Sequence, residues 1–162
     1  MSVRVQADDF DIGAEVKALT GGRSDIGAVV TFTGTVRGDT PDHPITSMTL
    51  EHYPGMTEAE LVRVEAEAND RWPLLDSLIV HRYGTLKPGD NIVLVITASA
   101  HRQAAFEAAE FLMDYLKSRA PFWKKEEGPD GSGRWVDARE CDEKAVSRWD
   151  KTRTLAAPDD AI

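Results

Sequence analysis

The hydrophobic and polar positions of the chain follow strand and helix periods in turn. Residues 2–5 alternate like a short strand, and residues 11–20 follow as a modest helix that an aspartate can cap. The run 26–37 is rich in β-branched residues, which predicts a long and largely buried strand. A polar loop over 38–44 separates it from a second alternating strand over 45–53. The first part of the chain therefore predicts strands with one helix between them.

A capping pattern marks the start of the next helix. Thr57 and Glu60 have the spacing of a capping box, and we expect this helix to end near Trp72. Two strands follow, over 76–86 and 91–100, with a Pro-Gly turn between them. The turn predicts that these two strands are antiparallel neighbours.

The longest helix is predicted from His101 to about Ala120, where Pro121 ends it. Short strands over 121–126 and 134–138 flank a Gly-rich turn and predict a hairpin. The helix has one apolar stripe, made of Ala105, Phe106, Ala109, Leu112, Met113 and Leu116.

Tight turns join several of the strand pairs. The pattern therefore predicts an α+β fold with a mostly antiparallel sheet and packed helices, and not a doubly wound parallel sheet. A chain of 162 residues suits one domain, which we place at residues 1–150. Residues 151–162 are expected to form a flexible C-terminal tail.

Composition narrows the classes of function. With 28 acidic and 19 basic side chains, the formal charge of −9 opposes binding to nucleic acids and anionic membranes. The chain has no membrane-spanning run, no secretory apolar core at its start and one cysteine, so a cytoplasmic protein is expected. The histidines lack metal-ligand spacing and no nucleotide motif is present, so neither a metal nor a cofactor is expected. An anionic ligand would have to meet a local cluster of cations.

Such a cluster lies around the end of the longest helix. Lys117 is in the last helical turn, and Lys124 comes seven residues later, where a strand that folds back brings it near Lys117. Two ammonium groups held close repel, so one is expected to have a lowered pKa and to act as a base or nucleophile. The pattern also fits solvated lysines, because a cation in the last turn complements the helix dipole.

Other cations suggest an anion site. His101 and Arg102 stand where a buried strand passes into the longest helix, whose first backbone N–H groups can bind an anion. Arg102 is unfavourable at this positive helix end unless an anion is present, whereas His101 can contact that anion or simply be the polar first residue. Arg37 ends its strand and is either a ligand contact or a strand-end charge, and Arg139 is a weaker candidate of the same kind.

Several stretches together resemble one known family. VTFTGTVR, LEHYPGMTE, HRYGTLKPGD, the run from SAHR through MDYLK to APFWKKE, and RWVDARE match in order and spacing. They resemble the catalytic large subunit of molybdopterin synthase over roughly residues 3–150, and the joined run is more specific than a short Gly motif.

The resemblance implies an α/β-hammerhead fold and a homodimer at the centre of a heterotetramer. A small ubiquitin-like sulfur-carrier subunit is expected at each end, with its C-terminal Gly-Gly thiocarboxylate in a pocket of the large subunit. There its sulfur would pass to cyclic pyranopterin monophosphate, and two transfers would form the dithiolene of molybdopterin in molybdenum cofactor biosynthesis. The resemblance thus implies a sulfurtransferase.

Matching motifs also imply roles for individual residues. Lys117 of MDYLK and Lys124 of APFWK correspond to the two catalytic lysines of the family. Lys125 follows directly, so the second role could belong to either neighbour, although strand alternation would send their side chains to opposite faces. Arg139 corresponds to a basic position that serves the site across the dimer. The substrate contacts that the resemblance implies are Arg37, His101, Arg102 and Arg139.

Two other functions fit the same residues. A Schiff-base lyase acting on a phosphorylated metabolite would use the same lysine and phosphate site without a protein partner. A non-catalytic module that docks the tail of a ubiquitin-like protein would bind its partner whether or not Lys117 is present. The sulfurtransferase is the leading hypothesis of the three.

Overall fold

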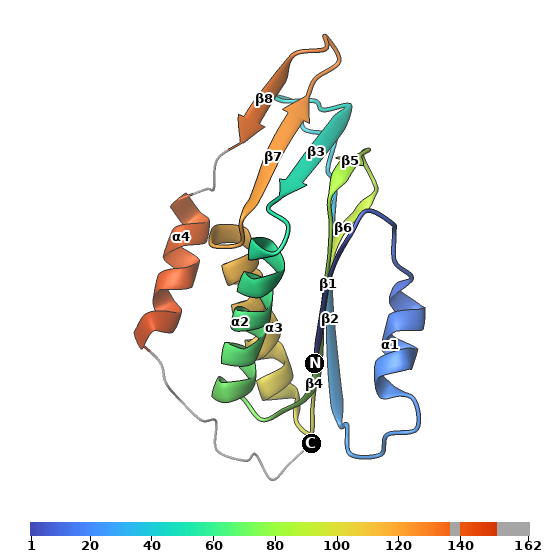
Figure 1. The fold of residues 1–162 in the computed structure, drawn as a ribbon, viewed down its shortest axis with the longest axis vertical. Helices are drawn as coiled ribbons and strands as arrows, with labels where there is room; N and C mark the ends of the chain where they lie inside the picture. The colour runs from blue at the N-terminus through green and yellow to red at the C-terminus, as the bar shows by residue number, and fades with distance from the viewer. Residues whose placement is uncertain (137–139, 152–162) are drawn as a thin grey trace.

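A computed structural model describes residues 1–136 and 140–151, and these contain two four-stranded β-sheets (Figure 1). The first sheet has the order β1–β4–β6–β2, in which β1 is parallel to β4 and the other pairs are antiparallel. Its strands are β1 (Ser2–Gln6), β2 (Ala28–Thr35), β4 (Leu74–Arg82) and β6 (Asn91–Ser99). The antiparallel pairing of β4 with β6 confirms the prediction for these two strands.

Helices cover both faces of the first sheet. α1 (Ile12–Thr20) packs on one face, and α2 (Met56–Arg71) with α3 (Arg102–Ser118) packs on the other (Figure 1). Because successive strand residues point to opposite faces, β4 and β6 supply both cores by alternation. Leu78, Val80, Leu94 and Ile96 lie on the α1 side, and Ile79, Val93 and Val95 lie on the α2 and α3 side.

The second sheet lies at one end of the molecule, at the top of Figure 1. It has the order β5–β3–β7–β8 and is antiparallel throughout. Its strands are β3 (Ser47–His52), β5 (Gly84–Leu86), β7 (Phe122–Glu127) and β8 (Gly133–Val136). The pairing of β7 with β8 confirms the predicted hairpin within the described residues. A small core of its own contains Val36, Met48, Leu50 and Leu86.

Two further elements follow the second sheet and lie beyond those that the sequence pattern predicts. They are α4 (Glu140–Ser147) and the short 3-10 helix η1 (Arg148–Lys151). Val146 is fully buried in the main core, and the Trp149 ring packs edge-on against Trp72. Of the predicted tail, residues 152–162 lie outside the described part. Over the described ranges, no helix is long and apolar enough to cross a membrane.

Two predicted strands differ from the structure. The strand predicted over 76–86 breaks at Gly84, whose φ of +95° favours glycine, so β4 stays in the first sheet and β5 joins the second. The prediction of a largely buried strand over 26–37 is wrong in burial, because β2 is an edge strand that exposes Val29 and Phe32. β-branched residues indicate a strand but not its position in a sheet.

The predicted start of α2 is also corrected. The helix begins at Met56, and the Glu58 carboxylate accepts a hydrogen bond from the backbone N–H of Gly55 at 2.7 Å. Glu58 therefore has the capping role that the pattern assigned to Glu60, and Glu60 instead forms an ion pair with Arg63. Several acidic residues lie near this helix start, so spacing alone does not identify the capping one.

The apolar stripe of α3 agrees with the structure at five of its six predicted positions. Phe106 is the exception, because its side chain is 62% exposed. Ala105 is completely buried, and the next residue along a helix is rotated by about 100° away from it. Phe106 therefore faces outward, and packing in the core does not explain why this residue is apolar.

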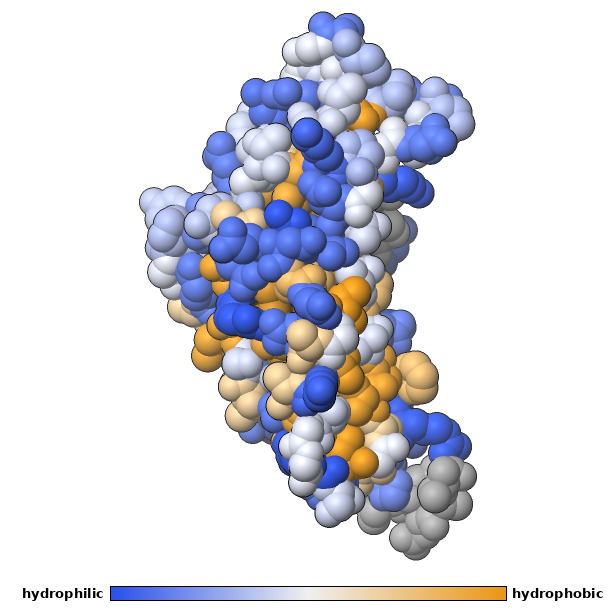
Figure 2. All heavy atoms as spheres, turned by 90° about the vertical axis from the view of Figure 1, so that its right-hand side faces the viewer, coloured by the Kyte–Doolittle hydropathy of each residue, from blue (hydrophilic) through white to orange (hydrophobic). Residues whose placement is uncertain are grey.

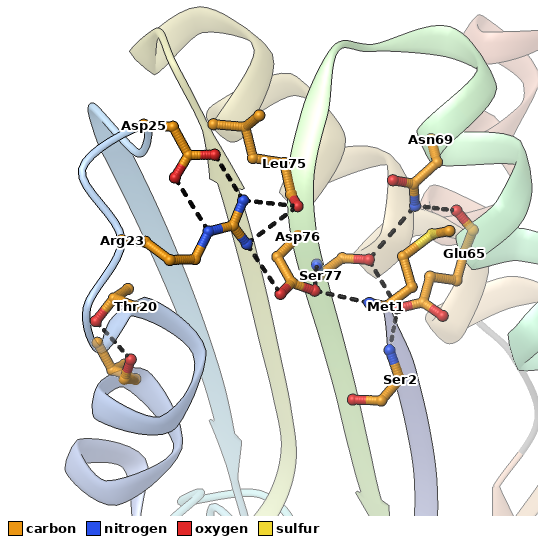
Figure 3. A network of polar contacts seen from close by, with 11 residues as sticks. Met1, Ser2, Thr20, Arg23, Asp25, Glu65, Asn69, Leu75, Asp76 and Ser77 are labelled. Carbon is orange, nitrogen blue, oxygen red and sulfur yellow. Dashed lines mark hydrogen bonds and ion pairs between the residues drawn. The ribbon is translucent and has the colours of Figure 1, made fainter.

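A polar network fastens β1 and β4 to α2 at the end of the first sheet that is far from the second sheet (Figure 3). Ser77 Oγ donates to the buried Glu65 carboxylate at 2.7 Å, and the backbone N–H of Ser2 donates to the same oxygen at 3.1 Å. Burial raises the pKa of Glu65. Arg23, in the connection after α1, donates to Asp76 of β4 at 3.3 Å. The network thus fixes the layers at this end of the molecule.

Candidate active site

A cavity of about 500 Å³ lies where the two sheets meet the C-terminal end of α3. Its wall comes from both sheets and from two helices. The contributing elements are β2 and the residues after it, β3, the end of β4, the start of β6, α3 and the residues after it, β7, β8 and α4. This volume is within the range of small-molecule sites. The charged or titratable residues in the wall are Arg37, His81, Lys117, Lys124, Glu126 and Asp142.

Lys117 and Lys124 reach the cavity from the two sides of a chain reversal. α3 ends in a tight turn in which the N–H groups of Arg119 and Ala120 both donate to the carbonyl of Tyr115, at 2.8 and 3.2 Å. β7 then runs back as a strand antiparallel to β3. The reversal therefore puts the lysine at the helix end and the lysine of the strand on one cavity.

The neighbouring Lys125 does not line this cavity. Side chains of β7 alternate between the faces of the second sheet, so Lys124 points to the cavity together with Phe122 and Glu126. The Lys125 ammonium instead lies 6.0 Å from the ring centre of Trp135, which is 55% exposed. Of the two adjacent lysines, the structure places Lys124 at the site.

Arg37 follows β2 and lines the same cavity. Among the described residues, neither Arg37 nor Lys117 has an ion-pair partner. Seven other arginines of this acidic chain pair with carboxylates, whereas Arg102 and Arg119, like Arg37, have no ion pair among the described residues. The seven paired arginines are Arg4, Arg23, Arg63, Arg71, Arg82, Arg134 and Arg148. Cations left unpaired in a cavity are suited to an anionic ligand.

His81, at the end of β4, is a cavity residue that sequence reasoning missed. Its side chain is buried, its ring stacks on Phe122 with 3.7 Å between ring centres, and Nδ1 lies 2.8 Å from the carbonyl oxygen of Arg82. Burial, reinforced by the positive charge of Lys117, lowers the pKa of His81 to about 4. The sequence holds one sign of its position. His81 comes two residues after Ile79, and alternation along the strand therefore places both side chains on the same buried face. Glu126 and Asp142 were missed as well.

The structure does not bring His101 and Arg102 into this cavity within one chain. They stand at the N-terminal end of α3, whereas Lys117 is in its last turn. With a rise of about 1.5 Å per residue, roughly 24 Å of helix separates the two ends. The His101 side chain makes no capping hydrogen bond. Arg139 lies outside the described residues.

The arrangement favours an anionic ligand held by side chains. Arg37, Lys117 and Lys124 supply positive charge, Phe122 supplies a flat apolar surface, and the two carboxylates limit the charge of the wall. Within the described ranges, no group of three or more His, Cys, Asp or Glu residues is placed to hold a metal ion.

Known proteins are similar to this chain in both sequence and fold. The family model described as MoaE protein matches residues 5–119. The molybdopterin synthase catalytic subunit of Mesorhizobium japonicum is 60% identical over 149 residues, which cover 91% of this chain and 92% of the relative. The resemblance expected from the motifs is thus confirmed.

Solved structures confirm the α+β fold. The molybdopterin biosynthesis MoaE protein of Burkholderia ambifaria matches with a TM-score of 0.79 and 53% identity, over 93% of this chain and 99% of that one. A Helicobacter pylori complex of subunits 1 and 2 of molybdopterin-converting factor matches with a TM-score of 0.65 over 85% of this chain and 90% of that one. Its identity of 20% shows a shared fold alone. By its sequence and its fold, this chain belongs to the MoaE protein family.

Proposed function

We propose that this chain is the catalytic subunit of a molybdopterin synthase, a sulfurtransferase of molybdenum cofactor biosynthesis. The observation that carries the proposal is the cavity wall of Arg37, Lys117 and Lys124 in a member of this family. The proposed reaction moves sulfur from a thiocarboxylated carrier to cyclic pyranopterin monophosphate. A thiocarboxylate and a phosphate are both anions, so both complement these cations.

Lys117 is the principal catalytic residue of the proposal. Its position in the last turn of α3 puts the amino group at the cavity without an ion-pair partner among the described residues. A lysine there can act as a nucleophile or as a general acid and base during thiocarboxylate transfer. Lys124 on β7 is the second catalytic or substrate-orienting group, and Arg37 binds the anionic end of the substrate.

The proposed protein partner is a small ubiquitin-like carrier with a C-terminal Gly-Gly thiocarboxylate. A tail of two glycines is narrow enough to enter a cavity of about 500 Å³ while the folded part of the carrier stays outside. The Helicobacter pylori complex of two different subunits, which shares the fold, supports a synthase built from two kinds of chain. We place the reaction in the cytoplasm, in keeping with a chain that has a single cysteine.

We also propose that two copies of the chain form a homodimer through the edge of the first sheet. β2 is an edge strand with Val29 and Phe32 exposed, and Phe106 of α3 is exposed beyond the core. Figure 2 shows apolar side chains in the lower half of the side that carries α1 and β2. Exposed apolar edges of this kind favour association. A two-fold contact here would make His101 and Arg102 available to the cavity of the partner.

The proposal is tested by conversion of cyclic pyranopterin monophosphate in a single turnover. The protein is mixed with a thiocarboxylated carrier, and the dithiolene is measured as its oxidised fluorescent derivative. Product is expected with the thiocarboxylate and not with the unactivated carboxylate form of the carrier. Absence of product with a verified carrier would contradict the proposal, and a borohydride-trapped adduct formed with a phosphorylated metabolite alone would favour a lyase.

A further inference from the structure

His81 uses one ring nitrogen inside the protein and presents the other to the cavity. A carbonyl oxygen only accepts hydrogen bonds, so Nδ1 carries the proton in its 2.8 Å contact with Arg82. Nε2 forms no hydrogen bond with any described residue. Yet no fully buried side-chain nitrogen or oxygen in the described part lacks a partner, so Nε2 must border accessible space. Because the cavity wall includes His81, we infer that this accessible space is the cavity.

The ring is a neutral acceptor in a charged wall. Burial lowers the pKa of His81 to about 4, and the nearby charges of Lys117 on α3 and His52 on β3 act in the same direction. At neutral pH the Nε2 lone pair is therefore available. The other titratable side chains of the wall are those of Arg37, Lys117, Lys124, Glu126 and Asp142.

Phe122 fixes the direction of this acceptor. Its ring lies nearly parallel to the imidazole, at an interplanar angle of 17° and a centroid distance of 3.7 Å. The stacking covers one face of the imidazole, and the Nδ1 bond prevents rotation of the ring. The lone pair of Nε2 lies in the ring plane, so its direction is set before any ligand binds.

We propose that His81 Nε2 accepts a hydrogen bond from an N–H group of the pterin ring while the cavity cations bind the phosphate. The proposal rests on the proposed function, because that function supplies a ligand with an anionic end and ring N–H donors. A carboxylate at this position would pair with the neighbouring Lys117, whereas a neutral imidazole accepts a ring N–H without neutralising the lysine. His81 is thus a substrate-binding residue outside the sulfur chemistry.

Two substitutions separate the ligand contact from the structural contact. In His81→Asn the amide nitrogen lies near the position of Nδ1 and can donate to Arg82, but no acceptor reaches the cavity. In His81→Gln the amide oxygen reaches the position of Nε2, but the bond to Arg82 is lost. His43→Asn, at an exposed histidine outside this cavity, is the matched control.

The measurement is the Kd of cyclic pyranopterin monophosphate, together with KM and kcat in the synthase assay and urea unfolding of each variant. We expect Asn to raise Kd and KM about tenfold with a smaller change in kcat, and Gln to retain most of the affinity despite lower stability. In wild-type protein labelled with ¹⁵N in the imidazole rings, the Nε2 signal of His81 should shift when substrate is added. The control should match wild type.

The opposite pattern would overturn the assignment. If Asn binds substrate as tightly as wild type, or affinity follows stability across the variants, His81 has only a structural role. If wild type forms dithiolene while the Nε2 signal stays unchanged with substrate bound, the histidine proposal fails and the synthase function stands. If wild type neither binds nor converts the pterin, both fail.

Discussion

At the scale of single residues, the main feature of the cavity is the set of cations in its wall, Arg37, Lys117 and Lys124. Arg37 and Lys117 lack ion-pair partners within the described residues, although acidic side chains outnumber basic ones in the chain. The sequence could predict Lys117 and Lys124 because a helix end followed by a strand brings them near each other. It could not predict His81, because alternation along a strand does not reveal which part of a face borders a cavity.

The low pKa of His81 predicts a pH dependence of stability. An unfolded histidine binds a proton below a pH of about 6.5, whereas the folded form stays neutral down to about pH 4. The unfolded state binds more protons in this window, so the free energy of unfolding should fall by up to about 3 kcal/mol as the pH drops from 6.5 to 4. Urea unfolding of wild type and His81→Phe at several pH values measures how much of the pH dependence of the free energy of unfolding comes from His81. Equal slopes in the two proteins would show that His81 does not hold a depressed pKa.

At the scale of elements, the site depends on the reversal between α3 and β7. The sequence predicted the end of this helix and the following hairpin from Pro121 and the Gly-rich turn, and both agree with the structure. It did not predict that the strand expected over 76–86 divides into β4 and β5. This break depends on the pairing of β5 with β3, which is distant in the sequence. Local patterns therefore identified the elements, and long-range pairing decided which sheet each joined.

Thr57 is expected to stabilise this arrangement through its hydroxyl group. The side chain is fully buried, accepts a hydrogen bond from the N–H of Tyr53 at 2.9 Å and donates to the carbonyl of Pro121 at 3.0 Å. Thr57→Val leaves both partners unsatisfied and should lower the free energy of unfolding by about 1–3 kcal/mol, measured by urea unfolding. Thr57→Ser keeps the hydroxyl and should lose less. A valine variant as stable as wild type would show that these bonds contribute little.

At the scale of the whole molecule, a chain with a net charge of −9 places three cations, Arg37, Lys117 and Lys124, in one cavity wall where its two sheets meet. The sequence could argue against a surface that binds nucleic acids or anionic membranes, since net charge is a property of composition. It could not locate the cavity, because the wall residues extend from Gly34 to Asp142. We infer that residues 1–150 unfold as one cooperative unit, since both sheets and α3 share this wall.

If the chain dimerises through the edge of the first sheet, a charged residue placed on this edge should prevent dimerisation. Phe32 on β2 is 39% exposed, and Phe32→Glu should convert the homodimer to monomers because the carboxylate would be buried at the contact. Light scattering coupled to size-exclusion chromatography reports the mass. Val62→Glu, at an exposed position of α2, is the matched control and should leave the dimer intact. Monomeric wild type, or a dimeric Phe32→Glu variant, would exclude this edge as the interface.

The most direct measurement is the single-turnover rate of dithiolene formation by wild type, Lys117→Ala and Lys125→Ala with the same thiocarboxylated carrier. Lys117 lines the cavity, whereas Lys125 lies on the other face of the second sheet over Trp135. We expect the Lys117 variant to lose roughly 10²–10⁴-fold in rate and the Lys125 variant to keep nearly the wild-type rate. A Lys117→Ala variant that converts the pterin as fast as wild type would contradict the assignment of this cavity as the active site.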